Sequence, residues 1–220
     1  MDNLLPLIQV LDPLFPIGGY TLSGGLETYT QKGLVRDRET LAAYLSAQLY
    51  LLPYGDLGVA AKAALGGDFV CLDGLCAAMK TPVEIREGSE KLCAHFLKAQ
   101  SVLRDFPLLD EYRGTIADGR CDGHYPVAVG LFIKSIEADI QTALELYCYS
   151  ILSAAANHTV KLVPLRQMDG QLSISAIMKR VPTAAQKAKT VSMDELGVSG
   201  CGFDLRAMQH ETLPGRLYIS

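Results

Sequence analysis

The chain has 220 residues, of which 49% are hydrophobic and 20% are charged, a balance typical of a globular protein with enough apolar side chains to form a core. A formal net charge of −4 gives no electrostatic reason to bind nucleic acid. No apolar run approaches the roughly 20 residues that a membrane-spanning helix needs, so composition argues against both a nucleic-acid-binding and a membrane-spanning protein.

The first distinctive segment in chain order is rich in glycine and reads FPIGGYTLSGGLE, over residues 15–27. Gly19 and Gly24 have the internal spacing of a phosphate loop, but that loop requires Lys followed by Ser or Thr after its second Gly. Gly25 and Leu26 stand there instead. We therefore interpret these glycines as permitting tight turns before a helix that starts near Gly24, and we expect the apolar side chains among them to pack on the core or on a partner.

Helical periodicity covers most of the chain that follows, beginning at Asp37 as an N-cap. Three segments place their apolar side chains on one helix face. These are Leu41, Leu45, Leu49 and Leu52; then Phe69, Leu72, Cys76 and Met79; and then, after Pro82, Leu92, Phe96 and Leu103.

The longest periodic segment, residues 127–160, predicts one long helix, or two in line, in the core. Glycine and proline predict turns between helices at residues 66–67, 106–107 and 119–123. Only Leu172, Ile174 and Ala176 alternate like a strand, which is too little to build a sheet. The pattern therefore predicts an all-α fold, an irregular helical bundle in which residues 1–220 form one domain. Its tail, residues 199–220, is expected to be partly irregular and to be ordered by a partner.

The chain offers few groups for catalysis or metal binding. Cys93 with His95, and Cys121 with Asp122 and His124, are the local candidates for metal ligands, and neither set is complete. The sequence has no CxxC pair, no HExxH motif and no GxSxG elbow. We therefore predict no catalytic residue, no cofactor and no metal site, while a weak or intersubunit metal site that uses His124 stays open as an alternative.

Six cysteines are spread along the chain, and we expect them to be reduced and buried. They are Cys71, Cys76, Cys93, Cys121, Cys148 and Cys201.

The N-terminal segment does not resemble a secretory signal peptide, because Asp2 stands where basic residues would be. A cytoplasmic location follows as the default expectation.

The segment DPLFPIGGYTLSGGLE, residues 12–27, resembles the N-terminal signature of the UreF family of urease accessory proteins. The resemblance covers nearly the whole chain. It continues at Gly55–Leu57, at Glu84, Arg86 and Ser89, at His124–Gly130, at Asn157, at Lys161–Gln167 and at Gly170-Gln171. It ends on the family's closing pattern, at Asp204, Met208–Glu211 and Arg216–Ser220. Gly24 and Arg166 depart from it, since the family often has His and Gly at these positions.

The resemblance implies an all-α protein that is not an enzyme and that takes part in assembling the nickel centre of urease. In the family, such a protein binds the accessory protein UreD, also called UreH, and forms a homodimer within that complex. It also recruits the GTPase UreG, which delivers nickel to apo-urease. Direct nickel binding, through His124 or His210, and regulation of GTP hydrolysis by the partner stay open as alternatives, as does an enzyme with a reactive Cys or His.

The resemblance, together with the apolar or interface-forming character of the side chains, leads to three sets of expected contact residues. The surface that faces the GTPase is expected to include or rest on Phe15, Ile17 and Tyr20. Contact with the UreD-type partner is expected at His210, Glu211, Arg216, Leu217 and Tyr218. The dimer contact is expected at Tyr149.

Overall fold

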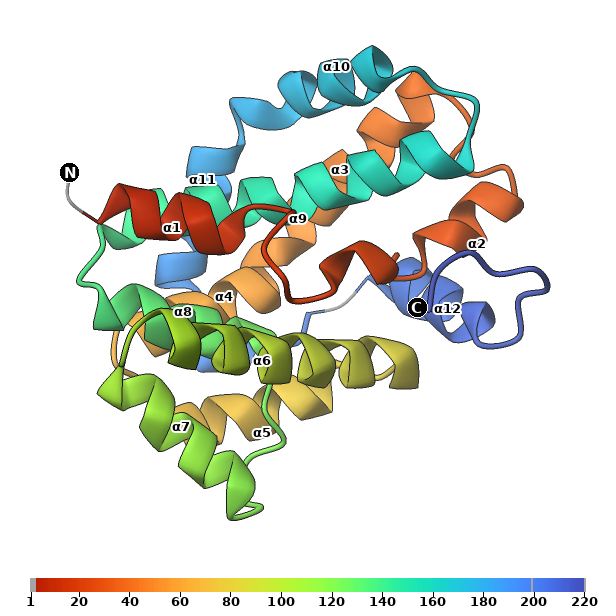
Figure 1. Ribbon diagram of the computed structural model, residues 1–220. Helices are drawn as coiled ribbons and strands as arrows, with labels where there is room; N and C mark the ends of the chain where they lie inside the picture. Colours follow the sequence, from red (N-terminus) through yellow and green to blue (C-terminus); the bar gives the residue numbers. More distant parts are fainter. Residues whose placement is uncertain (1–2, 199, 220) are drawn as a thin grey trace.

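Helices make up the regular structure of the protein. The computed structural model describes residues 3–198 and 200–219, and it contains no strand within these ranges (Figure 1). The prediction of an all-α fold is confirmed. Two residues of the predicted tail, Ser199 and Ser220, lie outside the described ranges.

The first half of the chain forms α1 to α6. Their bounds, with two short 3-10 helices, are α1 Leu4–Leu11, η1 Gly19–Thr21, α2 Leu26–Gln31, α3 Arg38–Leu51, η2 Leu52–Tyr54, α4 Asp56–Ala64, α5 Phe69–Met79 and α6 Val83–Leu103. The second half forms α7 Pro107–Ala117, α8 Tyr125–Ser135, α9 Ile140–Leu162, α10 Gln167–Met178, α11 Val181–Thr190, η3 Met193–Glu195 and α12 Cys201–His210.

Several of these boundaries agree with the local signals in the sequence. Asp37 caps α3 by accepting a hydrogen bond from the Thr40 N–H at 2.8 Å, as expected for an aspartate N-cap. The predicted turns at residues 66–67 and 119–123 fall between α4 and α5 and between α7 and α8, and the turn at 106–107 falls where α7 begins, with Pro107 as its first residue. No helix within the described ranges is both long and apolar enough to cross a membrane.

The prediction of one long helix, or two in line, over residues 127–160 is wrong, because the chain turns between α8 and α9 (Figure 1). Glu137 adopts a left-handed φ of 51°, which a continuous right-handed helix does not permit. Asp139 then caps α9 by accepting from the Thr142 N–H at 2.8 Å. The apolar spacing continues across this turn, so periodicity alone does not reveal it.

Leu172, Ile174 and Ala176, which alternate like a strand in the sequence, lie in α10, in agreement with the expectation that they build no sheet. One smaller expectation is corrected. Four of the six cysteines are buried as predicted, but Cys71 and Cys201 are exposed.

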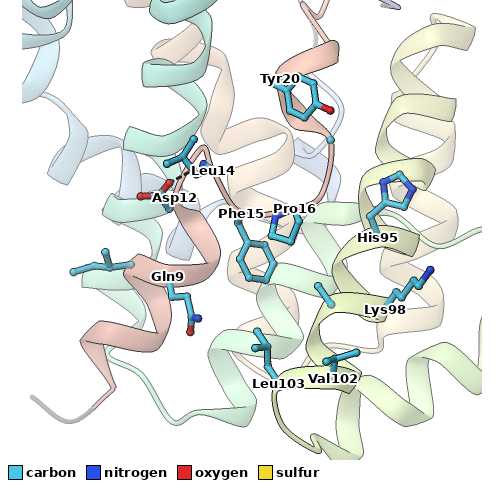
Figure 2. A pocket seen from close by; sticks show the side chains of 13 residues that line it. Gln9, Asp12, Leu14, Phe15, Pro16, Tyr20, His95, Lys98, Val102 and Leu103 are labelled. Carbon is cyan, nitrogen blue, oxygen red and sulfur yellow. Dashed lines mark hydrogen bonds between the residues drawn. The ribbon is translucent and has the colours of Figure 1, made fainter.

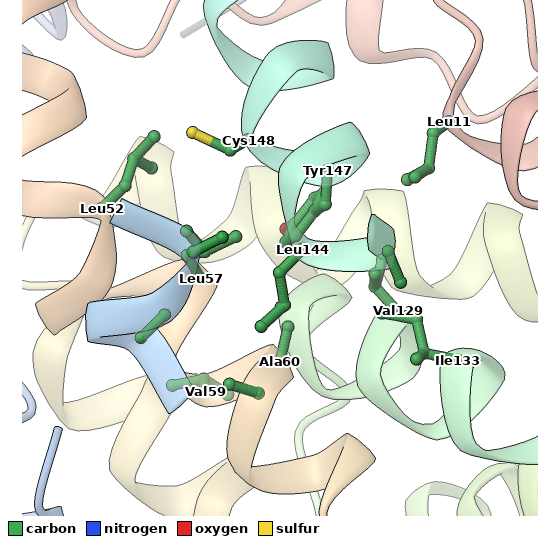
Figure 3. Packing of buried hydrophobic residues seen from close by; sticks show 14 of the residues in the cluster. Leu11, Leu52, Leu57, Val59, Ala60, Val129, Ile133, Leu144, Tyr147 and Cys148 are labelled. Atoms are coloured by element: carbon green, nitrogen blue, oxygen red, sulfur yellow. The ribbon is translucent and has the colours of Figure 1, made fainter. Parts of the chain in front are cut away.

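The core is centred where α4 crosses α8, and α9 packs on α4 and meets α8 through the rings of Tyr147 and Tyr125 (Figure 3). Small side chains let the first two helices approach closely. A Cβ atom added to Gly130 of α8 would lie 2.4 Å from the Ala60 carbonyl oxygen of α4, which is well inside contact distance. Leu144 and Tyr147 of α9 are buried against this crossing. The crossing thus forms a rigid base for the outer segments.

Candidate functional site

Three segments that are distant in sequence, α2, α6 and the C-terminal end of the chain, meet at one group of mostly buried charged side chains. We call it the carboxylate–histidine network, and it consists of Glu27, Glu84, His210 and Arg216. Glu27 comes from α2, Glu84 from α6 and His210 from the last turn of α12, while Arg216 lies in the segment that follows α12. Figure 1 shows α12 beside α2.

His210 lies at the centre of the network and is fully buried. Its Nε2 lies 3.1 Å from Glu27 Oε2, and its Nδ1 lies 2.6 Å from Glu84 Oε2. Through these two contacts His210 of α12 joins a carboxyl group of α2 to a carboxyl group of α6. Hydrogen bonds that involve an ionised carboxylate are among the stronger contacts inside a protein.

Glu27 holds the end of the chain in place. Its carboxylate accepts from the Leu217 N–H at 2.7 Å and from the Tyr218 N–H at 3.0 Å, in addition to His210. Burial alone would raise the pKa of Glu27, but these hydrogen bonds lower it below the ordinary value. The side chain is thus held in its ionised form by the C-terminal segment that it binds.

The C-terminal segment, residues 211–219, packs on its own chain. Arg216 Nη1 lies 2.5 Å from Glu84 Oε1, and the Ile219 N–H donates to the Thr21 carbonyl at 2.9 Å. The buried Tyr218 ring lies against the His158 ring of α9, with centroids 4.8 Å apart. The described part of the tail is therefore ordered by contacts within this chain.

The predicted partner-binding residues of the tail separate into two groups. His210 and Tyr218 are buried, so their contacts are internal. Glu211 and Leu217 are exposed, and the Arg216 side chain keeps 37% exposure while it pairs with Glu84. Only this second group presents side-chain surface to another molecule.

The residues predicted to face the GTPase lie beside an apolar groove of about 930 Å³ between α1, the glycine-rich segment and α6 (Figure 2). Phe15 is buried against Phe96 of α6, with ring centroids 6.2 Å apart. Ile17 is half-buried, and its carbonyl lies 3.0 Å from His95 Nδ1. Tyr20 is 66% exposed. Phe15 and Ile17 therefore support the rim of the groove, on which Tyr20 projects into solvent.

The groove and the C-terminal segment adjoin each other, because Thr21, which bonds to Ile219, immediately follows Tyr20. Tyr149, the predicted dimer contact, lies on α9 with 38% exposure. Within the described residues, no hydrogen bond connects it to the network.

A second cavity, of about 470 Å³, lies between the glycine-rich segment, α6 and α9. Its wall includes Glu84 of the network and also His158, Lys161 and Gly24. Gly24 is the position at which the family often has His, so in this chain that part of the wall has no imidazole. The cavity brings polar groups of three segments next to the network.

The arrangement around Cys121 argues against a reactive thiol. Burial, followed by the charge of Asp73, raises the pKa of Cys121 to about 11. A thiol nucleophile needs a lowered pKa, so this cysteine stays protonated at neutral pH and is unsuited to covalent catalysis.

Acid is expected to loosen the C-terminal segment in two steps. Burial, with the charge of Lys161, lowers the pKa of His158 to about 4 from its ordinary 6.5. The proton is then bound preferentially by the unfolded chain, so stability falls as the pH drops from 6.5 towards 4, by about 2 kcal/mol at pH 5. The pKa of Glu27 lies below its ordinary 4.5, so its contribution is complete above pH 4.5 and is lost below it.

Urea unfolding measured at a series of pH values tests this expectation. His158→Phe keeps an aromatic ring against Tyr218 but removes this titrating group, so the loss between pH 6.5 and 4 should shrink by about 2 kcal/mol at pH 5. The loss below pH 4.5 should persist, as should the part due to the buried His124, whose pKa burial also lowers. An unchanged pH dependence in this variant would contradict the assignment to His158.

Comparison with known proteins shows similarity along the whole chain. A family model described as UreF matches residues 35–178. A relative from Actinobacillus pleuropneumoniae, named urease accessory protein UreF, is 35% identical over 227 aligned positions that cover 100% of both chains. Relatives of the same name come from Haemophilus influenzae strain 86-028NP, 34% identical over 100% of this chain and 97% of the relative, and from Arthrobacter sp. strain FB24, 30% identical over 98% and 96%.

Proposed function

The chain belongs to the UreF family, and from this premise we propose that it is a urease accessory protein that takes part in assembling the nickel centre of urease. Its role is to hold other proteins in place and not to catalyse a reaction. The observation that carries this proposal is the carboxylate–histidine network, in which Glu27, Glu84, His210 and Arg216 come together from three distant parts of the chain. These residues hold the C-terminal segment in place and so fix the shape of the surface that it presents.

We assign the UreD-type partner to the exposed side of the C-terminal segment. Leu217 offers an apolar side chain that is 66% exposed, and Arg216 offers a guanidinium that Glu84 holds in place. Arg is among the residues enriched in binding hot spots, and an ordered side chain loses less entropy on binding than a free one. In this proposal His210 and Tyr218 act from inside the protein, by positioning the segment.

We assign the UreG-type GTPase to the groove beside Tyr20. A groove with apolar walls and an exposed tyrosine at its rim fits the anchor residues that protein interfaces favour. Because Thr21 joins this rim to the C-terminal segment, the two partners would occupy adjoining surfaces of one chain. In this scheme apo-urease receives the nickel cargo. The contact between two copies of this chain is proposed at Tyr149.

Co-expression with the UreD-type and UreG-type proteins, followed by affinity pull-down and size-exclusion chromatography with and without GTP, tests the proposal. The expected result is a stoichiometric complex of the three proteins whose composition changes with the nucleotide. Failure to bind either protein under any condition would contradict it.

Arg216→Ala is expected to reduce co-purification of the UreD-type partner at least about tenfold, because it removes both the exposed guanidinium and the bond to Glu84. Leu217→Ala removes an exposed side chain but keeps the backbone N–H that Glu27 binds. A loss in both variants indicates direct contact by the segment, whereas a loss with Arg216→Ala alone indicates that Arg216 positions it.

Leu65→Ala is the matched control, because Leu65 is 55% exposed and lies outside the C-terminal segment. Far-UV circular dichroism should be unchanged in all three variants. Undiminished co-purification with both Arg216→Ala and Leu217→Ala would remove the partner from this surface.

A further inference from the structure

We propose that Asp73, Asp122 and His124 form a binding site for a borderline divalent metal ion, of the class of Zn²⁺ or Ni²⁺. The three residues lie where α5 faces the loop that leads into α8. One ligand atom from each, a carboxylate oxygen or a ring nitrogen, lies within 4.8 Å of the other two. This inference concerns a separate part of the molecule and does not rest on the proposed function.

His124 provides the observation that points to a ligand. Its side chain is fully buried, and neither ring nitrogen has a hydrogen-bond partner within the described residues. Buried polar groups are almost always satisfied, so an imidazole with two vacant nitrogens beside two carboxylates requires an explanation.

Asp73 contributes a buried negative charge. Its carboxylate accepts from the backbone N–H groups of Asp122 at 2.7 Å, Gly123 at 3.2 Å and His124 at 2.9 Å, and also from the Tyr112 hydroxyl. These bonds fix Asp73 at the beginning of α8. No side-chain cation is bonded to it within the described residues, so its charge is offset by hydrogen bonds alone.

Coordination by Asp73 requires one of its acceptor positions to become free, and Tyr112 offers a way. The Tyr112 hydroxyl also lies 3.4 Å from the His124 carbonyl. When its proton turns to that carbonyl, one lone pair of Asp73 becomes free for a metal ion. The backbone bonds that hold the start of α8 are not disturbed by this change.

The spacing suits a small cation. Zn²⁺ binds nitrogen and oxygen ligands at about 2.0–2.2 Å in a tetrahedral arrangement, which places neighbouring ligand atoms roughly 3.4 Å apart. The three ligand atoms lie within 4.8 Å of one another, so binding would draw the side chains closer together around the ion. Asp122 is exposed, so it gives the ion a path from solvent, and water completes the coordination.

The donor set determines the class of metal. One imidazole and two carboxylates suit Zn²⁺, Ni²⁺ and Co²⁺, whereas Mg²⁺ prefers sites made only of oxygen ligands. The proposed donor set contains no thiolate, so it is selective for borderline ions and not for soft ones.

Isothermal titration of the purified, untagged chain with Zn²⁺, Ni²⁺ and Mg²⁺ tests the site. The expected result is one Zn²⁺ or Ni²⁺ per chain and no binding of Mg²⁺. Asp122→Asn, at an exposed position that leaves the fold intact, should weaken binding at least about tenfold, and so should His124→Gln. In the wild type, Co²⁺ should give a visible absorption band that both variants lose.

Asp118→Asn is the matched control, because Asp118 is exposed and lies outside the cluster. This variant should bind the metal as the wild type does. Circular dichroism identifies a variant that fails to fold, and Asp122→Asn then decides the result alone. The proposal is overturned if the wild-type chain binds neither Zn²⁺ nor Ni²⁺, or if Asp122→Asn binds them with unchanged affinity.

Discussion

Replacing Glu27 by Ala is expected to lower the free energy of unfolding by about 3–5 kcal/mol, because removal of one partner leaves other buried polar groups uncompensated. His210 would lose one of its two carboxylates, and the N–H groups of Leu217 and Tyr218 would lose their acceptor. Glu27 is 2% exposed, so water cannot take its place without rearrangement. Urea unfolding measures the loss.

The part of the molecule that loosens in Glu27→Ala is as informative as the size of the loss in stability. Hydrogen exchange at residues 211–219 should become fast in Glu27→Ala, while amides of the crossing between α4 and α8 stay protected. Glu211→Ala removes an exposed carboxylate from the same end of the chain and should leave both measurements unchanged. If residues 211–219 stayed protected in Glu27→Ala, the segment would be held by contacts other than the network.

This variant also connects stability to function. In the proposed function the UreD-type partner binds the outer side of the C-terminal segment, so a segment that is released should bind weakly although its exposed side chains are intact. Preorganisation would then account for part of the affinity. Glu27→Ala and Leu217→Ala would thus lose the partner for different reasons, and only the first would also lose exchange protection.

The fold was largely predictable from the sequence because helices follow local rules. The cap at Asp37 and the glycines at residues 66–67 act over a few residues, and the sequence contains these signals in full. The turn between α8 and α9 was missed because Ile136 and Ile140 continue the apolar spacing across it. Its cause is the left-handed Glu137 together with the cap at Asp139, and neither changes the hydrophobic pattern.

The candidate site was predictable only as separate segments. The motif resemblance singled out Glu27, Glu84, His210 and Arg216, and the comparisons confirm the family. The contact between Glu27 and His210 joins residues 183 positions apart, and nothing local to either residue indicates it. Asp73 was missed for the same reason, since its bond to His124 spans 51 positions.

The expectation that a partner orders the tail came from its composition. Glycine and proline in residues 199–220 indicate irregular backbone, but irregular backbone is compatible with order when buried acceptors are available. Glu27 and Thr21 supply those acceptors. Composition therefore predicted the conformation of residues 211–219 and could not predict what holds them.

Gly130→Val is expected to prevent stable folding, with a loss of about 3 kcal/mol or more in the free energy of unfolding. Its Cβ would lie 2.4 Å from the Ala60 carbonyl oxygen and 2.6 Å from the Ala63 Cβ. Both obstacles belong to α4 itself, so relief requires α4 and α8 to separate at the centre of the core. Urea unfolding and the yield of soluble protein measure the effect.

Gly114→Ala is the matched control, because Gly114 also lies within a helix, α7, but a Cβ there would meet nothing within 4 Å. Alanine favours the helix over glycine by up to about 1 kcal/mol, so this variant should be slightly more stable than the wild type. The two substitutions have opposite expected signs although each adds side-chain atoms to a helical glycine. A Gly130→Val protein as stable as the wild type would mean that α4 and α8 do not approach as closely as described. α6, which carries Glu84 of the network, and α5, which carries Asp73 of the candidate metal site, both pack against this crossing. Such a result would therefore also contradict the geometry described for these two sites.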